Sequence, residues 1–340
     1  MHKKISVIGA GSWGTALAIL LAENRASIRL WGHHPTLVEE LINHRINSTY
    51  LPGLRLPPNV YATHQLVDTL DAELILMVTP SKAIRHVASE IAKLGVSPHS
   101  ILISCTKGIE HETGKLMSEV LEDCFPKNPI AVLSGPNHAI EVAQKIPAAA
   151  VMGAVHPELL KQLQKTFFLP SFRIYTSDDV KGIQLGGALK NVFAIGAGAS
   201  DGFNMGDNAK AALVTRALAE MSRLGVALGG RRETFQGLSG IGDLMVTCFS
   251  RHSRNRSFGE RVGRGESPTT IQESMKMVVE GVPTTQSARR LALQLGIEAP
   301  IVEAVYQVVY EGKTPHDALW ELLERRPRTE LDSLTQSIEK

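Results

Sequence analysis

Short apolar runs alternate with stretches of helical periodicity through the first half of the chain. The apolar runs predict buried strands over residues 5–9, 27–32, 73–79, 101–105 and 130–134, with weaker candidates over 148–152 and 172–176. Helical patterns lie between them, for example over 15–22 and 80–94, and a proline-rich extended segment covers 50–58. Strands that alternate with helices predict an α/β fold, a Rossmann-type doubly wound parallel sheet.

The pattern changes near Val180, after which helical periodicity dominates. Apolar residues recur at 288, 291, 292 and 295 before Gly296, and at 301, 305, 308 and 309 before Gly312. Thr314-Pro315 then begins a last amphipathic helix. A chain of 340 residues also exceeds what one core usually supports. We therefore expect an α/β domain over 1–180 and an all-helical C-terminal domain over 181–340.

Three glycines follow the first predicted strand and open the first predicted helix. Gly9, Gly11 and Gly14 form G-x-G-x-x-G. In such a motif the first glycine permits a tight turn, the second lets the backbone approach a pyrophosphate, and the third lets the helix pack closely on the strand. The free amides of the helix N-terminus then face the phosphates. This context predicts a bound dinucleotide; the alternative is a glycine-rich turn without a ligand.

The second predicted strand ends in His33-His34, with no carboxylate between Ile28 and Thr36. Strands that bind NAD often end in an acid that accepts hydrogen bonds from the ribose 2′-hydroxyl and would repel a 2′-phosphate. Because no acid is present here, no carboxylate would repel the 2′-phosphate of NADP. The alternative is that both histidines are exposed loop residues.

Thr79, Lys107 and Gly135 each lie just beyond a predicted strand. In parallel sheets ligands bind beyond the carboxyl ends of the strands. We therefore expect these three residues to share one crevice with Gly11.

Lys190 lies in a helical stretch of glycine and apolar residues, LGGALKNVFAIGAG. A lysine in that setting either extends its ammonium to the surface or points into a cleft. Partial burial lowers a lysine pKa and suits a general acid for a carbonyl oxygen. Asp243 and Thr247 lie one helical turn apart among apolar residues, and Asp243 is a candidate partner for Lys190. The alternative is that Asp243 caps its own helix.

Residues 251–264 contain five arginines and one acid, Glu260. Ser253-Arg254-Asn255 comes just before a predicted helix, and an arginine fork beside helix N-terminal amides makes a good phosphate clamp. The alternatives are a solvated face or a nucleic-acid surface. A single basic run without interleaved aromatic residues is thin support for nucleic acid.

Composition narrows the class of protein. Lys and Arg total 36 against 34 acids, so no overall field favours nucleic acid or membrane. No apolar run reaches the 18 residues that a membrane-spanning helix requires. The start, MHKKISVIG, lacks the pattern of a signal peptide. Three widely spaced cysteines fit neither a disulfide framework nor a metal site, and the histidines lack ligand spacing. We expect a cytoplasmic protein with no metal, nucleic-acid partner or membrane insertion.

Six motifs occur in a characteristic order: GAGSWGTALA, TKGIE, SGP, LGGALKNVFAI, GLSGIGDLMVTC and SRN. Together they resemble the NAD(P)-dependent glycerol-3-phosphate dehydrogenase family in its bacterial form, over residues 5 to 325. The resemblance implies a Rossmann domain followed by a helical domain, and a homodimer. It implies an oxidoreductase that uses NADP(H) or NAD(H) to interconvert dihydroxyacetone phosphate and sn-glycerol 3-phosphate. That reaction supplies the glycerol backbone for phospholipid synthesis.

The resemblance also implies a role for individual residues. Cofactor contacts, besides the glycine motif, fall on Ser12, Trp13, His33, Tyr50, Lys107, Ala139, Arg254, Val278 and Glu280. Substrate contacts fall on Lys107, Gly135, Asn137, Lys190, Asp243, Ser253, Arg254 and Asn255. Lys190 resembles the proton donor and acceptor of the family.

Two positions depart from the family pattern. The family usually has Ser or Thr followed by Phe where this chain has Asn137-His138. It more often has an arginine where His33 or His34 stands. These departures bear on the substrate contacts near Asn137 and on the strength of a preference for NADP.

Two rival functions fit parts of the same pattern. A β-hydroxyacid dehydrogenase of similar architecture would use Arg254 to clamp a carboxylate. A non-catalytic, dinucleotide-binding regulator is the second rival, because a fold alone does not establish chemistry. Lys190, Asp243 and Arg254 argue against the regulator, since a sensor needs no proton donor.

Overall fold

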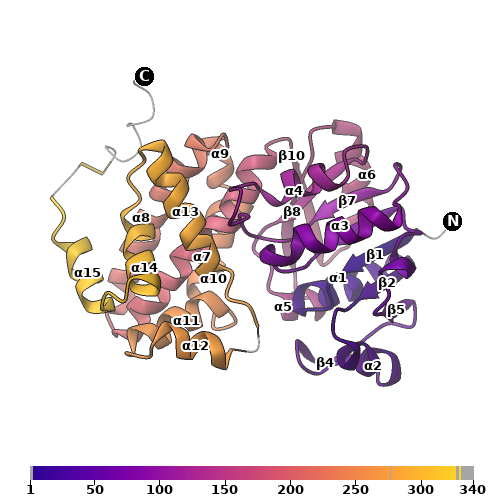
Figure 1. The fold of residues 1–340 in the computed structure, drawn as a ribbon, viewed down its shortest axis with the longest axis horizontal. Helices are drawn as coiled ribbons and strands as arrows, with labels where there is room; N and C mark the ends of the chain where they lie inside the picture. The colour runs from indigo at the N-terminus through magenta and orange to yellow at the C-terminus, as the bar shows by residue number, and fades with distance from the viewer. Residues whose placement is uncertain (1–2, 276, 327–328, 331–340) are drawn as a thin grey trace. The chain divides into compact units, whose positions relative to one another are not determined.

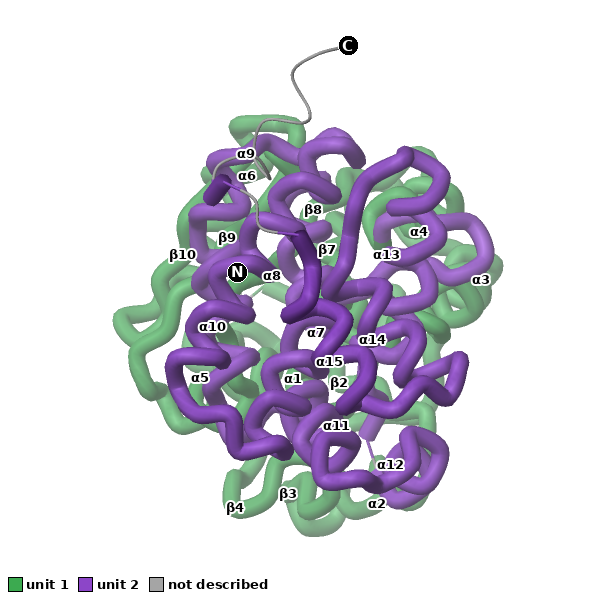
Figure 2. Tube along the Cα trace, turned by 90° about the vertical axis from the view of Figure 1, so that its left-hand side faces the viewer, with its two compact units in different colours: residues 1–106, 117–180 green, residues 107–116, 181–340 purple. Residues whose placement is uncertain are grey.

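The computed structural model describes residues 3–275, 277–326 and 329–330. The expected end of the helical domain, 331–340, lies outside the described residues. The chain divides into two compact units (Figure 2): unit 1 holds residues 1–106 and 117–180, and unit 2 holds 107–116 and 181–340. Unit 2 therefore includes a segment from within the expected α/β domain. Ile109 and Leu116 of that segment are buried in the helical core, which explains why it belongs there.

Unit 1 is built on an eight-stranded sheet in the order β10-β9-β8-β7-β6-β1-β2-β5 (Figure 1). Its strands are β1 (Lys4–Ile8), β2 (Ser27–Trp31), β5 (Val60–Thr63), β6 (Leu74–Met77), β7 (Ile101–Ser104), β8 (Ile130–Ser134), β9 (Ala148–Gly153) and β10 (Phe172–Ser177). The predicted doubly wound sheet is confirmed, and the short strand β5 is an addition to it.

One strand pair departs from the expected parallel arrangement, because β9 runs antiparallel to β8. The helix between them, α5 (Ala139–Ala143), has only five residues. The extended segment over 50–58 contains β4 (Leu51–Arg55), which pairs antiparallel with β3 (Ile46–Asn47) in a separate two-stranded sheet.

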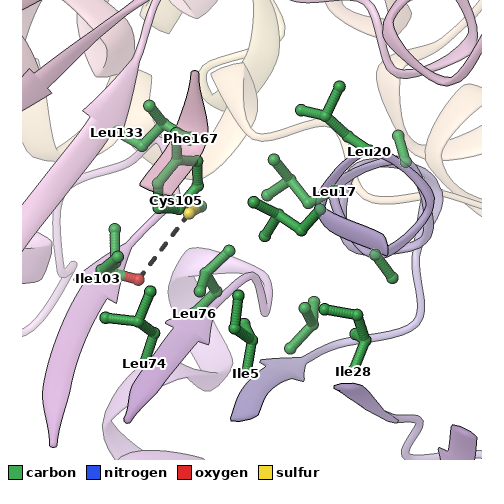
Figure 3. Close-up of a cluster of buried hydrophobic side chains, with 14 of the residues drawn as sticks. Ile5, Leu17, Leu20, Ile28, Leu74, Leu76, Ile103, Cys105, Leu133 and Phe167 are labelled. Carbon is green, nitrogen blue, oxygen red and sulfur yellow. Dashed lines mark hydrogen bonds between the residues drawn. The ribbon is translucent and has the colours of Figure 1, made fainter. Parts of the chain in front are cut away.

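Helices cover both faces of the large sheet. One apolar cluster joins the sheet to α1 (Ser12–Ala22), α5 and α6 (Pro157–Phe167). Figure 3 shows its centre, where Leu17 and Leu20 of α1 lie near Ile5 and Leu76 of the strands. A second cluster joins the sheet to α3 (Ile84–Leu94) and α4 (Met117–Cys124). The remaining helical elements of unit 1 are α2 (Pro35–Asn43) and two 3₁₀ turns, η1 (Leu66–Thr69) and η2 (Ser81–Ala83).

Every regular element in the described part of residues 181–340 is helical. The elements are α7 (Val180–Gly202), α8 (Gly206–Ala227), α9 (Arg232–Phe235), the π-helical turn η3 (Leu238–Gly242), α10 (Asp243–Phe249), α11 (Arg254–Gly263), α12 (Pro268–Ser274), α13 (Gly281–Leu295), α14 (Pro300–Tyr310) and α15 (Pro315–Leu323). Two predicted helix boundaries are confirmed: Gly296 ends α13 with φ +64°, and the Thr314 side chain caps α15. Within the described residues, no helix combines the length and apolar character needed to cross a membrane.

The long helix α7 forms the centre of unit 2. Its residues are buried continuously from Gly182 to Ile195, a length that leaves no solvated face over almost four turns. Leu185, Val192 and Phe193 belong to a core that α8, α11 and α14 also supply. Lys190 therefore lies in an apolar environment because its helix is buried on all sides.

Candidate active site

Lys190 is held inside unit 2 by two oxygen acceptors from α10. Its side chain is only 9% exposed, and its Nζ lies 2.6 Å from Asp243 Oδ1 and 2.6 Å from Thr247 Oγ1. Thr247 in turn donates to the Asp243 carbonyl oxygen at 2.6 Å, as its position one helical turn later allows. The predicted pairing of Lys190 with Asp243 is confirmed, and the ammonium does not extend to the surface.

Asp243 joins two lysines. Its Oδ2 lies 2.5 Å from Lys107 Nζ, while Oδ1 contacts Lys190. The Asp243 side chain is 1% exposed and that of Lys107 is 20% exposed, so Lys107 is the more open of the two cations. Two ammonium groups against one carboxylate leave a net positive site. Such a site favours an electron-rich oxygen or an anion as its ligand.

Burial lowers the pKa of Lys190 from its ordinary 10.5 to about 8, an effect that the Lys107 cation reinforces and Asp243 opposes. A donor whose pKa lies near the working pH transfers protons efficiently. The buried helix α7 thus lowers the pKa of Lys190, and the ion pair with Asp243 offsets the free-energy cost of burying the ammonium.

The N-terminus of α11 carries Ser253, Arg254 and Asn255. The Ser253 side chain caps the helix by accepting from Arg256 N at 3.1 Å. Arg254 is exposed, and its Nη1 donates to the Val278 carbonyl oxygen at 3.0 Å. Glu280 is the N-cap of α13 and acts on Arg254 as a nearby charge. The structure therefore groups the residues around α11 that the family resemblance implies.

Asn255 has a structural task that the sequence does not reveal. Its Nδ2 donates to Asn191 Oδ1 at 2.9 Å, and its Oδ1 accepts from Gly281 N at 2.8 Å. The buried amide thus links the residue next to Lys190 with the first residue of α13. Because those partners occupy the side chain, the Asn255 group left for a ligand is its backbone amide at the helix N-terminus.

The arginine run divides into distinct environments. Arg261 pairs with Glu266 at 2.6 Å, and Arg264 pairs with Glu260. Arg256 turns inward toward Asp201, at 2.6 Å. The run therefore does not form a uniform solvated face. Arg254 differs from the other three arginines because it donates to a backbone carbonyl.

The glycine motif of unit 1 has the geometry that the sequence predicts. Gly9 has φ +125°, and a Cβ there would lie 2.8 Å from Val78 O. A Cβ at Gly14 would overlap with Gly9 O, so both glycines are required by the packing of the chain itself. A Cβ at Gly11 would meet no atom within 4 Å. The open space beside Gly11 fits the backbone approach of a pyrophosphate.

The start of α1 is equally suited to phosphate. Its N-cap, Gly11, provides no side-chain cap, and its first turn, which begins Ser12-Trp13, has no acid. The helix amides and the positive end of the dipole are therefore available to an anion. Trp13 packs partly buried against the main apolar cluster, as does Ala139 at the start of α5.

Asn47 is a residue that the sequence analysis missed. Its buried Nδ2 donates to Ala10 O at 2.9 Å and to Thr15 Oγ1 at 2.8 Å, while its Oδ1 accepts from Tyr50 N at 3.0 Å. Asn47 thereby ties the segment that carries Tyr50 to the glycine-rich turn. Asn47 is the last residue of the two-residue strand β3, which is too short to give a periodic signal, so only the fold could identify it.

Exposed histidines follow β2. The His33 and His34 rings meet edge to face at 5.1 Å between centroids, and His33 lies 6.1 Å from the Trp31 ring. His34 is also the N-cap position of α2. His33 is thus an exposed side chain beyond the carboxyl end of a strand, where a ribose would be recognised.

Some buried polar atoms without a hydrogen-bond partner among the described residues lie beyond β6 and β8. Thr79 Oγ1 and Asn137 Oδ1 are two of several such atoms, which in unit 2 include Arg256 Nε and Thr284 Oγ1. Asn137 Nδ2 donates to Ala149 O at 3.0 Å, which fixes the amide, and Gly135 has φ +141° beside it. Such atoms mark a place where a polar ligand completes the bonding. No group of three or more metal-ligating side chains occurs within the described residues.

A glycine-rich turn on a doubly wound sheet, with a lysine–carboxylate pair in a helical second unit, defines a dinucleotide-dependent dehydrogenase. Residues 4–160 match the family model described as the N-terminus of NAD-dependent glycerol-3-phosphate dehydrogenase, and residues 179–320 match that of its C-terminus. The chain belongs to the NAD-dependent glycerol-3-phosphate dehydrogenase family.

Relatives named glycerol-3-phosphate dehydrogenase [NAD(P)+] match almost the whole chain. The protein of Chlorobium phaeobacteroides is 45% identical, over 96% of this chain and 99% of its own. That of Levilactobacillus brevis is also 45% identical, over 97% and 100%. The crystal structure of glycerol-3-phosphate dehydrogenase from Coxiella burnetii matches with a TM-score of 0.92 and 37% identity, over 95% and 99% of the two chains.

Proposed function

We propose that this protein catalyses the NAD(P)-dependent interconversion of dihydroxyacetone phosphate and sn-glycerol 3-phosphate, and so supplies the glycerol backbone for phospholipids. The observation that carries the proposal is the buried Lys190 ammonium, bonded to Asp243 and Thr247, with a pKa near 8. Family membership supports the substrate and cofactor.

The residues of unit 2 account for the proton and the phosphate. When bound, the reduced nicotinamide supplies the hydride that reduces C2 of the ketone. Lys190 Nζ gives its proton to the carbonyl oxygen, and Lys107 polarises and places that carbonyl. Arg254 and the first amides of α11 hold the phosphate, whose binding orients the reacting carbon. In the reverse direction neutral Lys190 accepts the proton of the alcohol.

The residues of unit 1 account for the dinucleotide. The turn at Gly9, Gly11 and Gly14 holds the pyrophosphate, with Ser12 and Trp13 at the helix start. We assign His33 and Tyr50 to cofactor binding, and Gly135 and Asn137 to substrate binding, as the family resemblance implies. Because no acid follows β2, we infer that NADPH is accepted and preferred to NADH.

We also propose that the enzyme works in the cytoplasm as a homodimer. The family resemblance supports the dimer, and three free thiols suit a reducing compartment. Light scattering of the purified protein tests the oligomeric state, and cell fractionation tests the location.

The decisive experiment mixes the protein with NADPH and dihydroxyacetone phosphate and follows the absorbance of the reduced cofactor. Loss of absorbance that requires both protein and phosphorylated ketone supports the proposal. Parallel reactions replace the ketone with 2-keto acids, and reactions in the oxidising direction use 3-hydroxy acids. Turnover of those acids alone would favour a β-hydroxyacid dehydrogenase, and cofactor binding without any turnover would favour a regulator.

A further inference from the structure

Unit 2 also contains a partly buried ion cluster that involves helices α7, α8 and α11. We call it the Asp201 cluster; it comprises Asp201, Lys210, Arg256 and Glu260. Lys210 Nζ lies 2.8 Å from Asp201 Oδ2, and Arg256 Nη2 lies 2.6 Å from the same oxygen. Arg256 Nη1 reaches Glu260 Oε2 at 3.1 Å. The side chains of Lys210 and Arg256 are 8% and 14% exposed, so these are not surface ion pairs.

The cluster joins three helices of unit 2. Asp201 lies near the end of α7, Lys210 on α8, and Arg256 two residues after Arg254 on α11. Lys210 Nζ also lies 4.8 Å from the centre of the Phe249 ring at the end of α10. The helices that carry Lys190, Asp243 and Arg254 are therefore all in contact with this one cluster.

The backbones of α7 and α11 are closely packed beside this cluster. A Cβ at Gly198 of α7 would overlap with Arg256 O, and a Cβ at Gly259 of α11 would overlap with Ile195 O. The two helices thus touch backbone to backbone. The Arg256 guanidinium, bonded to both Asp201 and Glu260, adds an ion pair between the same two helices.

We propose that Arg256 is a positioning residue for phosphate recognition: by its bond to Asp201 it fixes the first turn of α11, with Arg254 and the Asn255 amide, against the helix that carries Lys190. The inference rests on the proposed function. The two terminal nitrogens of Arg256 are engaged by Asp201 and Glu260, so we assign it a positioning role rather than a substrate contact. The phosphate is held at one end of the substrate and the carbonyl at the other, so a shift of α11 misplaces one relative to the other.

The test is Arg256→Met, which removes the guanidinium but keeps the length of the side chain. The substitution leaves Lys210 with Asp201 and Arg264 with Glu260, so each remaining buried charge keeps a partner. The matched control is Arg289→Met, because Arg289 also pairs with a carboxylate, Glu303 at 2.7 Å, but on α13 and α14. Both variants and the parent are assayed with dihydroxyacetone phosphate and with unphosphorylated dihydroxyacetone.

We expect Arg256→Met to raise the KM for dihydroxyacetone phosphate by about ten- to a hundredfold. Its kcat/KM for dihydroxyacetone should stay within about twofold of the parent, because that substrate has no phosphate to place. Arg289→Met should change neither. Arg256→Lys, which keeps the cation beside Asp201, should recover part of the lost affinity.

Three results would overturn the inference. The first is a folded Arg256→Met protein with the parent KM, and the second is an equal loss with both substrates, which indicates a general structural effect. If Arg256→Met does not fold, Arg256→Lys decides in its place, and a parent KM for that variant is the third. A parent protein that never reduces dihydroxyacetone phosphate would instead refute the proposed function, which is a separate outcome.

Discussion

At the scale of single residues, the proposed chemistry depends on the pKa of the Lys190 ammonium. Lys190 would have an ordinary pKa on a surface helix. Inside unit 2 its pKa falls to about 8 because burial disfavours the charged form, and Asp243 keeps the group in place. Asp243 therefore holds the Lys190 ammonium in place, and together with Lys107 the group keeps a net positive charge.

The pH dependence of the two directions should differ in sign. Ketone reduction needs protonated Lys190, so kcat/KM should be constant below pH 8 and fall above it. Alcohol oxidation needs neutral Lys190, so kcat/KM should rise with pH through the same value. Steady-state assays in both directions across pH 6–10 measure this. Profiles that bend in the same sense would contradict the assignment.

Removal of the ammonium should abolish most of the catalysis. Lys190→Met keeps most of the side-chain stem, so the fold and NADPH binding should survive, as melting curves and fluorescence titration would show. General acid catalysis contributes about 10²–10⁴-fold in rate, so kcat should fall by at least about that factor. A folded, NADPH-binding variant that turns over at the parent rate would exclude Lys190, and Lys107 would then be the next candidate.

We predict that cofactor choice also depends on a single side chain, that of His33. His33→Asp places a carboxylate beyond β2, where it would repel a 2′-phosphate and accept hydrogen bonds from a 2′-hydroxyl. The Kd for NADPH should rise far more than the Kd for NADH. Titrating the same variant with both cofactors provides the internal control. Equal weakening of the two would mean that this loop does not read the 2′ position.

At the scale of elements, close helix packing determines where the site residues lie. Gly196 and Gly198 are two residues apart on α7, yet their surroundings differ. A Cβ at Gly196 would meet its nearest atoms at 3.8 Å, an ordinary contact, whereas a Cβ at Gly198 would overlap with Arg256 O. The same substitution at the two positions therefore separates helix propensity from interhelical contact.

Gly196→Ala should stabilise the protein by about 0.5–1 kcal/mol, because alanine favours a helix interior. Gly198→Ala should destabilise it despite the same gain in propensity, since α11 must move away from α7. It should also raise the KM for dihydroxyacetone phosphate. Denaturant unfolding and steady-state kinetics on the pair check both statements. Matching stabilities for the two variants would show that α7 and α11 are not in backbone contact.

At the scale of the whole molecule, the chain does not divide at a single point. Residues 107–116 leave unit 1 after β7, contribute Lys107 to the Asp243 site and bury Ile109 and Leu116 in the core of unit 2. Unit 2 is therefore assembled from two separate stretches of sequence.

Ile109→Ala should lower the stability of unit 2, although the residue lies between strands of unit 1 in the sequence. The loss of a buried large side chain costs about 2–5 kcal/mol. Hydrogen exchange resolved by peptide should show faster exchange in α7 and α14, while β1, β6 and β7 keep their protection. Faster exchange in the strands alone would assign the segment to unit 1.

The sequence by itself determined the elements that repeat a local pattern. Buried parallel strands are apolar throughout, and amphipathic helices repeat every three to four residues, so both could be predicted. Glycine positions such as Gly9, Gly14 and Gly296 could also be predicted, because Gly9 and Gly296 have positive φ and a Cβ at Gly14 would overlap with Gly9 O. Lys190 stood out because it is a lone charge among apolar neighbours, and the structure buries it beside Asp243; its role as proton donor stays a prediction.

Only the tertiary structure decided the relations between distant residues. The antiparallel β9, the bonds of Asn47 to the glycine turn, and the inward turn of Arg256 toward Asp201 all depend on segments far apart in the chain. Side-chain pairing and burial of this kind leave no periodic trace, because each follows from how helices and strands pack rather than from local preference. Local pattern thus predicted which residues are candidates for the chemistry, and packing decided which partner each of them has.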